Sequence, residues 1–256
     1  MNRFLLMNGS TVCRRFSGAA TICDKHFSFP FFFSILFNFT GVFVTNNTLA
    51  QSSNPAQQKE VYQKSIFERS AKIVNTLSIT DSVEYKKIQS IIANQYFALA
   101  DLQDRYAAEA ANIKKQLPEQ DKQSTAIKPL EEKKAAQVIQ LHNNFVGQLN
   151  DNLNSSQVEK VKDGMTYNIM PITYTAYLEE VPTLTSEQKA KIYDWLKEAR
   201  ELAMDGESSD KKHAVFGKYK GRINNYLSAA GYDMKKEGEE WAKRIQAAKE
   251  AKQTKN

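Results

Sequence analysis

The chain has 256 residues, of which 41% are hydrophobic, so it can bury one sizeable core or two smaller ones. Its formal net charge of +6 arises from 35 basic and 29 acidic side chains. This near balance lacks the clustered basic field of nucleic-acid-binding proteins, and we expect no nucleic-acid partner.

The first fifty residues have the pattern of a secretory signal peptide. Basic residues precede an apolar run, Phe27 to Val44, and small residues follow it up to Ala50, where a signal peptidase would cut. We therefore expect residues 1–50 to be removed and the mature protein to be secreted or periplasmic. The alternative is a retained membrane anchor, since spanning helices need roughly 17–25 residues. Pro30 and Gly41 interrupt the run and favour cleavage.

Loss of the leader would limit the chemistry that remains. Both cysteines, Cys13 and Cys23, lie in the leader, so the mature chain would have no disulfide and no thiolate nucleophile or metal ligand. The leader also holds four of the basic and one of the acidic residues, which leaves 31 against 28, a net charge of +3. We expect no stable membrane insertion after cleavage.

After a flexible polar spacer, residues 51–57, the sequence predicts helices almost throughout, because good helix formers dominate and period-two runs are scarce. A first helix is expected over residues 58–77. A longer one should run to Gln116 from its N-cap Asp81, with Glu84 completing a capping box.

Residues 118–129, bounded by two prolines, predict a loop. A return helix is expected over residues 130–153. Two long helices joined by a short loop favour an antiparallel hairpin.

Residues 163–182 form the least helical part of the mature chain, and we interpret them as an irregular crossing segment. Gly164 is expected to end the preceding helix in the left-handed conformation. Long crossings inside helical domains are often functional, and this one carries Tyr167, Tyr174 and Tyr177.

The C-terminal part predicts three helices, over residues 186–204, 209–230 and 233–251, followed by a disordered tail at residues 252–256. Capping boxes are predicted at two helix starts, Ser156 with Glu159 and Thr185 with Gln188. We therefore predict a single all-α domain over residues 58–251. In it, the long antiparallel hairpin packs with a C-terminal group of about three helices across the irregular crossing segment.

The helix over residues 209–230 has an unusual surface. One stripe is apolar and should face the core, whereas the opposite stripe contains small or amide side chains, with Gly217 and Gly221 four residues apart. A glycine inside a helix costs about 1 kcal/mol relative to alanine, so two on one face need a reason. Either another helix packs closely there or the face is open to a ligand.

This helix also concentrates planar polar groups. A guanidinium and two amides offer paired donors and acceptors that suit vicinal hydroxyls or a carboxylate, and tyrosines add flat apolar faces. The candidate ligand-binding residues are Lys218, Arg222, Asn224, Asn225 and Tyr226, together with Tyr167 and Tyr174 of the crossing segment. The alternative is that the tyrosines belong to the core and Arg222 pairs with a nearby acid.

The mature sequence contains no catalytic signature, and we name no catalytic residue. Its two histidines, His142 and His213, lack HExxH spacing, so we expect neither a metal site nor a cofactor. Acidic residues near predicted helix ends are better explained as caps. Trp195 shares a stripe with Ile192 and Leu196 and is assigned to the core.

Three runs of the sequence resemble the domain of unknown function 3826 family: VEKVKDGMTYN, LTSEQKAKIYDWLKEARELAMD and SSDKKHAVFGKYKGRINNYLSAAGYDMKK. The resemblance covers about residues 59–241 and is strongest from Leu184 onward. It implies a secreted bacterial protein for which sugar binding has been suggested, and it carries over no activity. The Leu-Thr-x-x-Gln start at Leu184 also resembles periplasmic helical stress chaperones.

Three hypotheses for function follow. The first is a secreted, non-enzymatic binding protein with carbohydrate as its ligand. The second is a periplasmic helical chaperone or scaffold for protein clients, which predicts an exposed apolar concave surface. The third is a carboxylate-based glycan-processing enzyme, which requires two acids facing each other across a cleft.

Overall fold

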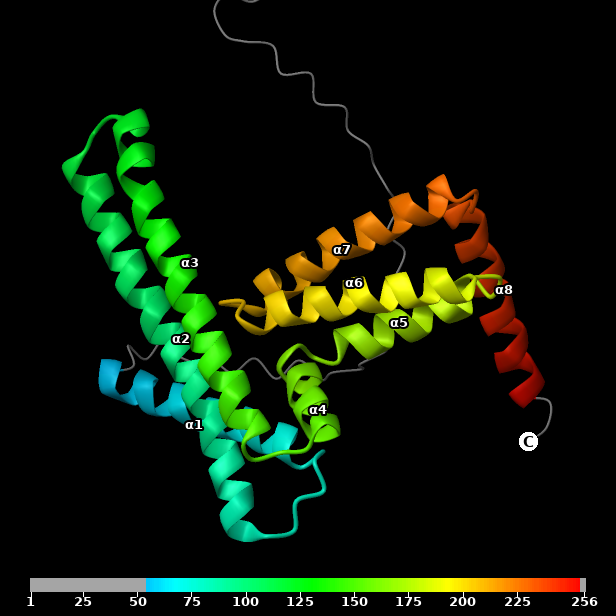
Figure 1. Ribbon diagram of the computed structural model, residues 1–256, viewed down its shortest axis with the longest axis horizontal. Coiled ribbons are helices and arrows are strands. Elements are labelled where there is room, and N and C mark those ends of the chain that lie inside the picture. The colour runs from blue at the N-terminus through cyan, green and yellow to red at the C-terminus, as the bar shows by residue number, and fades with distance from the viewer. Residues whose placement is uncertain (1–53, 254–256) are drawn as a thin grey trace, which may run out of the picture. The chain divides into compact units, whose positions relative to one another are not determined.

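The computed structural model describes residues 54–253 and is all-α over that range, with eight helices and no strand (Figure 1). The all-α prediction is thereby confirmed. The expected leader, the start of the spacer at residues 51–53 and residues 254–256 of the expected tail lie outside the described residues. None of the helices within residues 54–253 combines the length and apolar character needed to cross a membrane.

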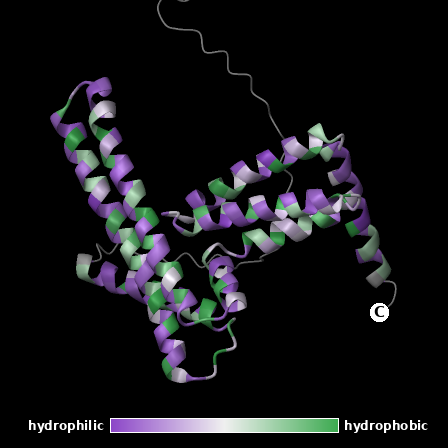
Figure 2. Cartoon of the chain, in the orientation of Figure 1, coloured by the Kyte–Doolittle hydropathy of each residue, from purple (hydrophilic) through white to green (hydrophobic). Residues whose placement is uncertain are grey.

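The helices follow one another with short connections. Their bounds are α1 Pro55–Val74, α2 Ser82–Gln116, α3 Gln120–Asn150, α4 Ser155–Met165, α5 Ile169–Glu180, α6 Ser186–Met204, α7 Ser209–Ala229 and α8 Met234–Gln253. Figure 2 shows apolar and polar residues alternating along most of them, as expected for helices that bury one side.

The two longest helices, α2 and α3, pack side by side (Figure 1). The predicted loop over residues 118–129 is wrong, because α3 already begins at Gln120 and contains Pro129 in its interior. Tertiary packing offsets the backbone hydrogen bond that proline removes. Leu130, directly after Pro129, is buried against Leu102 and Tyr106 of α2.

The predicted irregular crossing segment is also wrong, since α4 and α5 occupy nearly all of it. The chain breaks between them at Thr166–Asn168, where Tyr167 and Asn168 adopt the left-handed conformation with φ of 58° and 55°. Gly164 does not end α4 by this conformation. It lies inside the helix, and a Cβ at this position would be 2.9 Å from Cγ1 of Ile73 on α1, so the glycine permits close packing of two helices.

The capping residues predicted from the sequence are partly correct. The Thr185–Gln188 capping box is confirmed, and Asp81 caps α2 by accepting from two backbone amides. The Ser156–Glu159 box is wrong, because Asn154 caps α4 with Gln157 as its reciprocal partner. Here two capping motifs overlap in the sequence, and Glu159 is engaged elsewhere.

The buried apolar residues form two main clusters. One joins α1, α2, α3 and α4 with Met204 at the end of α6, and includes Ile88, Ile92 and Leu149, all fully buried. The other joins α5, α6 and α7 and includes Leu196 and Phe216. The contact of α4 with α6 therefore lies where the two clusters meet.

We predict opposite effects of adding a methyl group at two helical glycines. Gly164→Ala should destabilise the protein, because crowding against Ile73 costs roughly 1–3 kcal/mol. Gly217→Ala is the matched control, since nothing lies within 4 Å of its Cβ position, and it should stabilise α7 by up to about 1 kcal/mol. Urea unfolding of both variants measures the difference. Equal effects would show that the Gly164 contact does not constrain packing.

Candidate functional site

The central part of the predicted ligand surface lies where α7 packs on α6. The guanidinium carbon of Arg222 is 4.4 Å from the centroid of the Trp195 ring, and its Nη1 is 3.6 Å from Oε2 of Glu198. The ring of Tyr226 meets Trp195 edge-on, with centroids 5.3 Å apart. We call Trp195, Glu198, Tyr219, Arg222 and Tyr226 the α6–α7 surface cluster. It holds the guanidinium over an aromatic ring while 53% of the Arg222 side chain stays exposed.

Trp195 is the buried member of this cluster, and other members pack on its ring. Its residue exposure is 9%, and Lys191 also lies over the ring, 5.3 Å from the centroid. Trp195 therefore belongs to the core, as the sequence predicted, and does not offer a bare ring to a ligand. Nearby, burial and the adjacent Glu198 carboxylate raise the pKa of Tyr219 to about 12, so its hydroxyl remains protonated at neutral pH.

The outer face of α7 is open. Among the described residues, no atom of a neighbouring element lies within 4 Å of the Cβ positions of Gly217 and Gly221, and both glycines are exposed. Of the two alternatives for this face, packing by a second helix does not occur within residues 54–253. Lys218 and Asn225 are exposed beside the glycines. Their side chains are accessible from the same side of the helix as Arg222.

Not all predicted site residues come together. Asn224 lies on the flank of α7 that faces α5, where its Oδ1 accepts a 2.7 Å hydrogen bond from the hydroxyl of Tyr177. Tyr167 stacks on His213 with a centroid distance of 5.8 Å, and Tyr174 meets Tyr193 edge-on at 5.3 Å. The predicted set thus divides into three parts. Lys218, Arg222 and Asn225 are exposed on α7, and Tyr226 is half-buried against Trp195. Asn224, Tyr167 and Tyr174 contact residues of other elements.

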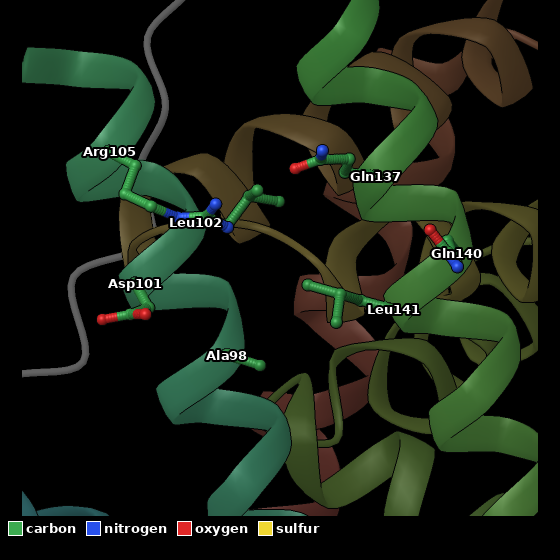
Figure 3. Close-up of a pocket in the computed structure, with 7 residues that line it drawn as sticks. All are labelled: Ala98, Asp101, Leu102, Arg105, Gln137, Gln140 and Leu141. Carbon is green, nitrogen blue, oxygen red and sulfur yellow. The ribbon is translucent and has the colours of Figure 1, made fainter. Parts of the chain in front are cut away.

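A shallow groove of about 210 Å³ lies between α2 and α3 (Figure 3). In Figure 3, Leu102 and Leu141 project into it from opposite helices. The remaining lining residues are Ala98, Asp101, Arg105, Gln137 and Gln140. These groups could hydrogen-bond a small polar molecule, but the lining includes no aromatic ring and none of the residues predicted from the sequence.

A buried guanidinium between α4 and α6 was not predicted. Arg200 is 1% exposed, and its Nη1 and Nη2 donate to Asp163 at 2.7 Å and to Glu159 at 2.6 Å. Burial alone would raise the pKa of Glu159, but the hydrogen bond and charge of Arg200 outweigh burial and lower it. For Asp163, which is more deeply placed, burial dominates and the pKa is raised. Both carboxylates are bound tightly by one cation.

The ionic contacts continue from Arg200 toward α3. Glu201 accepts a 2.7 Å hydrogen bond from Lys162 and lies 3.6 Å from Nε2 of His142. Nδ1 of His142 is 2.8 Å from Asp205, and this hydrogen bond raises the pKa of the histidine. We call these seven residues the Arg200 network: His142, Glu159, Lys162, Asp163, Arg200, Glu201 and Asp205. Since its acids are paired with its cations, the network is suited to joining helices rather than to proton transfer.

The sequence did contain a signal for this network. Arg200 falls on the same helical stripe as Ile192, Leu196 and Ala203, which are all fully buried. A charged residue within an apolar stripe must bring partners with it, because an unpaired buried charge is too costly. Glu159 and Asp163 are four residues apart and share one side of α4, so they were available as those partners.

The helices and sites together define an all-α domain held by a charged contact between helices, with an open polar surface on α7. The chain matches the family model described as a protein of unknown function (DUF3826) over residues 63–247. This match spans well over half of the chain, and the protein belongs to that family. No curated protein matches it.

We predict that the Arg200 network dominates the stability of the α4–α6 contact. Arg200→Met should cost roughly 3 kcal/mol, because it leaves Glu159 and Asp163 without their cation. Arg200→Met combined with Glu159→Gln and Asp163→Asn should recover much of the loss. The matched control is Arg222→Met. Arg222 is exposed, and its ion pair with Glu198 contributes at most about 1 kcal/mol. Urea unfolding provides the measurement, and similar losses for both single variants would contradict the prediction.

Proposed function

We propose that this protein is a non-catalytic carbohydrate-binding protein that acts outside the cytoplasm after loss of its leader. The binding surface consists of the exposed part of the α6–α7 surface cluster with Lys218 and Asn225. One observation carries the proposal: the guanidinium of Arg222 is held 4.4 Å over the Trp195 ring with about half of its side chain in solvent.

This arrangement suits hydroxyl groups for a physical reason. An arginine already fixed on an aromatic ring loses less conformational freedom when a ligand binds, so more of the interaction energy appears as affinity. Its planar fork can donate to two adjacent oxygens, as vicinal hydroxyls present them. Glu198 contributes acceptors and Asn225 contributes both a donor and an acceptor, which together match the mixed character of sugar hydroxyls.

The same surface supports binding rather than hydrolysis. Glycoside hydrolysis uses two carboxyl groups that flank the scissile bond, one as acid and the other as base or nucleophile. The α6–α7 surface cluster contains a single carboxylate, Glu198, and it is paired with Arg222. Glu159 and Asp163, which do lie close together, share the buried guanidinium of Arg200 and face a contact between helices.

A glycan array probed with the wild-type protein, Arg222→Ala and Asn225→Ala tests the proposal. We expect wild-type binding to at least one glycan and a loss of about tenfold for Arg222→Ala, since hydrogen bonds from charged groups contribute about 1.5–3 kcal/mol. Asn143→Ala, an exposed amide on α3, serves as the control and should bind normally. Absence of glycan binding by the folded wild-type protein would refute the proposal.

A second function, binding of protein clients, is favoured by a different surface. Tyr62 and Phe67 on α1 are 42% and 41% exposed, and both meet Phe97 of α2 edge-on at centroid distances of 6.0 and 5.9 Å. Val61, which precedes Tyr62 in the sequence, is 63% exposed. We call these four residues the α1 aromatic patch. Exposed apolar side chains gathered on neighbouring helices in this way are typical of sites that bind proteins.

If clients bind at the α1 aromatic patch, the wild-type protein should slow aggregation of a denatured enzyme. Tyr62→Ser/Phe67→Ser should remove most of this protection, because it takes away the exposed apolar side chains. Ile139→Ser is the control, since Ile139 is 60% exposed on α3. Light scattering follows the aggregation. Equal protection by all three proteins would exclude the patch as a client site.

A further inference from the structure

The charge on α7 is strongly one-sided. Over Ser209–Ala229 the helix carries five basic residues and one acidic residue, Asp210, in its first turn. One of the five, Lys212, is 4% exposed and turned inward, where its ammonium donates to the carbonyl oxygens of Met165 and Met204 at 3.0 Å each. The other cations remain on the outside and flanks of the helix.

Three of these cations form a row along the exposed side. Lys211, Lys218 and Arg222 are separated by seven and four residues, which correspond to about two turns and one turn, so they lie on one side of α7. We call them the α7 cation row. At 1.5 Å per residue the row spans about 16 Å of helix. Asn225 continues it, and all four residues are exposed.

The charge of this row is hardly neutralised by the protein. Within residues 54–253, neither Lys211 nor Lys218 forms an ion pair. Arg222 pairs with Glu198 at 3.6 Å, but both side chains are more than half exposed, and such pairs contribute at most about 1 kcal/mol. The row therefore presents a positive field to a ligand that approaches from solvent.

The surface next to the row allows an extended ligand to approach closely. Gly217 and Gly221 lie alongside it, with open space at both Cβ positions. A polymer of sugar rings could thus lie on the backbone of α7 with its charged groups directed at the cations. The glycines allow a ligand to approach the helix closely, whereas the cations determine which ligands bind more tightly as a result.

Among polyanions, the described aromatic contacts favour a polysaccharide over a nucleic acid. Single-stranded nucleic acids bind by stacking their bases on exposed aromatic faces beside basic side chains. The aromatic ring that Arg222 contacts is Trp195, which is already covered by Arg222, Lys191 and Tyr226. Lysine and arginine alone suffice for the carboxylates of a uronic-acid polymer, because they form charge-assisted hydrogen bonds with them.

We infer that the ligand is an acidic polysaccharide whose uronate carboxylates bind the α7 cation row. This inference rests on the proposed carbohydrate-binding function and specifies the class of carbohydrate. A neutral glycan would use Arg222, Asn225 and Lys218 as hydrogen-bonding groups but would gain nothing from the charge of the row.

The test uses oligogalacturonate and alginate oligomers, each before and after chemical reduction of the carboxyl groups to neutral hydroxymethyl groups. Isothermal titration with the full mature chain should show that at least one uronate oligomer binds about tenfold more tightly than its reduced form. Its affinity should fall as salt rises, because salt screens exposed charges. Lys211→Gln/Lys218→Gln should lower affinity for the uronate form about threefold to tenfold, as expected for two exposed ion pairs, and should lower affinity for the reduced form by a clearly smaller factor.

Lys86→Gln/Lys87→Gln is the matched control, since it removes two exposed charges from α2 and should bind like the wild type. Thermal unfolding by circular dichroism verifies that each variant is folded. Equal affinity for charged and reduced oligomers would overturn the inference and leave the proposed carbohydrate function intact. Binding to neither form also overturns it, and the neutral-glycan array then decides the proposed function separately. Equally tight, equally lysine-dependent binding of single-stranded DNA would show an unspecific polyanion surface and overturn the inference as well.

Discussion

The burial of Arg200 is the constraint on which the arrangement of these helices depends. Removing a guanidinium from water is costly, and the cost is offset here by hydrogen bonds of 2.6 and 2.7 Å to two carboxylates on α4. These bonds require α4 and α6 to meet at one register, because the planar fork accepts few orientations. Apolar contacts alone would tolerate small slips between the helices. The charged contact therefore specifies how the two apolar clusters meet.

The position of α7 follows from this contact through a second buried cation. Burial lowers the pKa of Lys212 to about 8, which still leaves the amine largely protonated at neutral pH. The ammonium bonds the last carbonyl oxygens of α4 and α6, where the negative ends of both helix dipoles favour a positive charge. The start of α7 is thus attached to the same two helices that Arg200 joins. Farther along α7, Arg222 rests on Trp195 of α6, so the orientation of the exposed guanidinium also depends on α6.

Several features that depend on interactions between residues close in the sequence were predicted correctly. Helical periodicity and helix-forming composition predicted the all-α fold, and the Thr185–Gln188 box marked a helix start correctly. The sequence was a poor guide where distant contacts decide. Pro129 stays within a helix because Leu130 packs on α2, and Gly164 serves the approach of Ile73, which lies far away in the sequence. Neither partner could be identified from the local pattern.

The same distinction applies to the candidate site. The periodicity of α7 placed Arg222 and Asn225 away from the core, and both are exposed. It could not show which neighbour each flank would meet, so Asn224 was grouped with them although it accepts a hydrogen bond from Tyr177. Tyr167 and Tyr174 were included because they lay in a segment that was expected to be irregular. Tyr174 lies in α5 and Tyr167 in the short turn before it, and their rings contact Tyr193 and His213.

In α7, the residues that stabilise the fold and the residues available to a ligand lie on opposite sides of the helix. Phe216, Ile223 and Leu227 hold the helix in place from its inner side, whereas Gly217 and Gly221 on the outer side meet no neighbouring described residue. Mutations on the outer side can therefore accumulate without loss of folding, since the stability margin of the domain depends on other residues. Such a face is free to change its ligand preference over evolutionary time while the buried side of the same helix stays fixed.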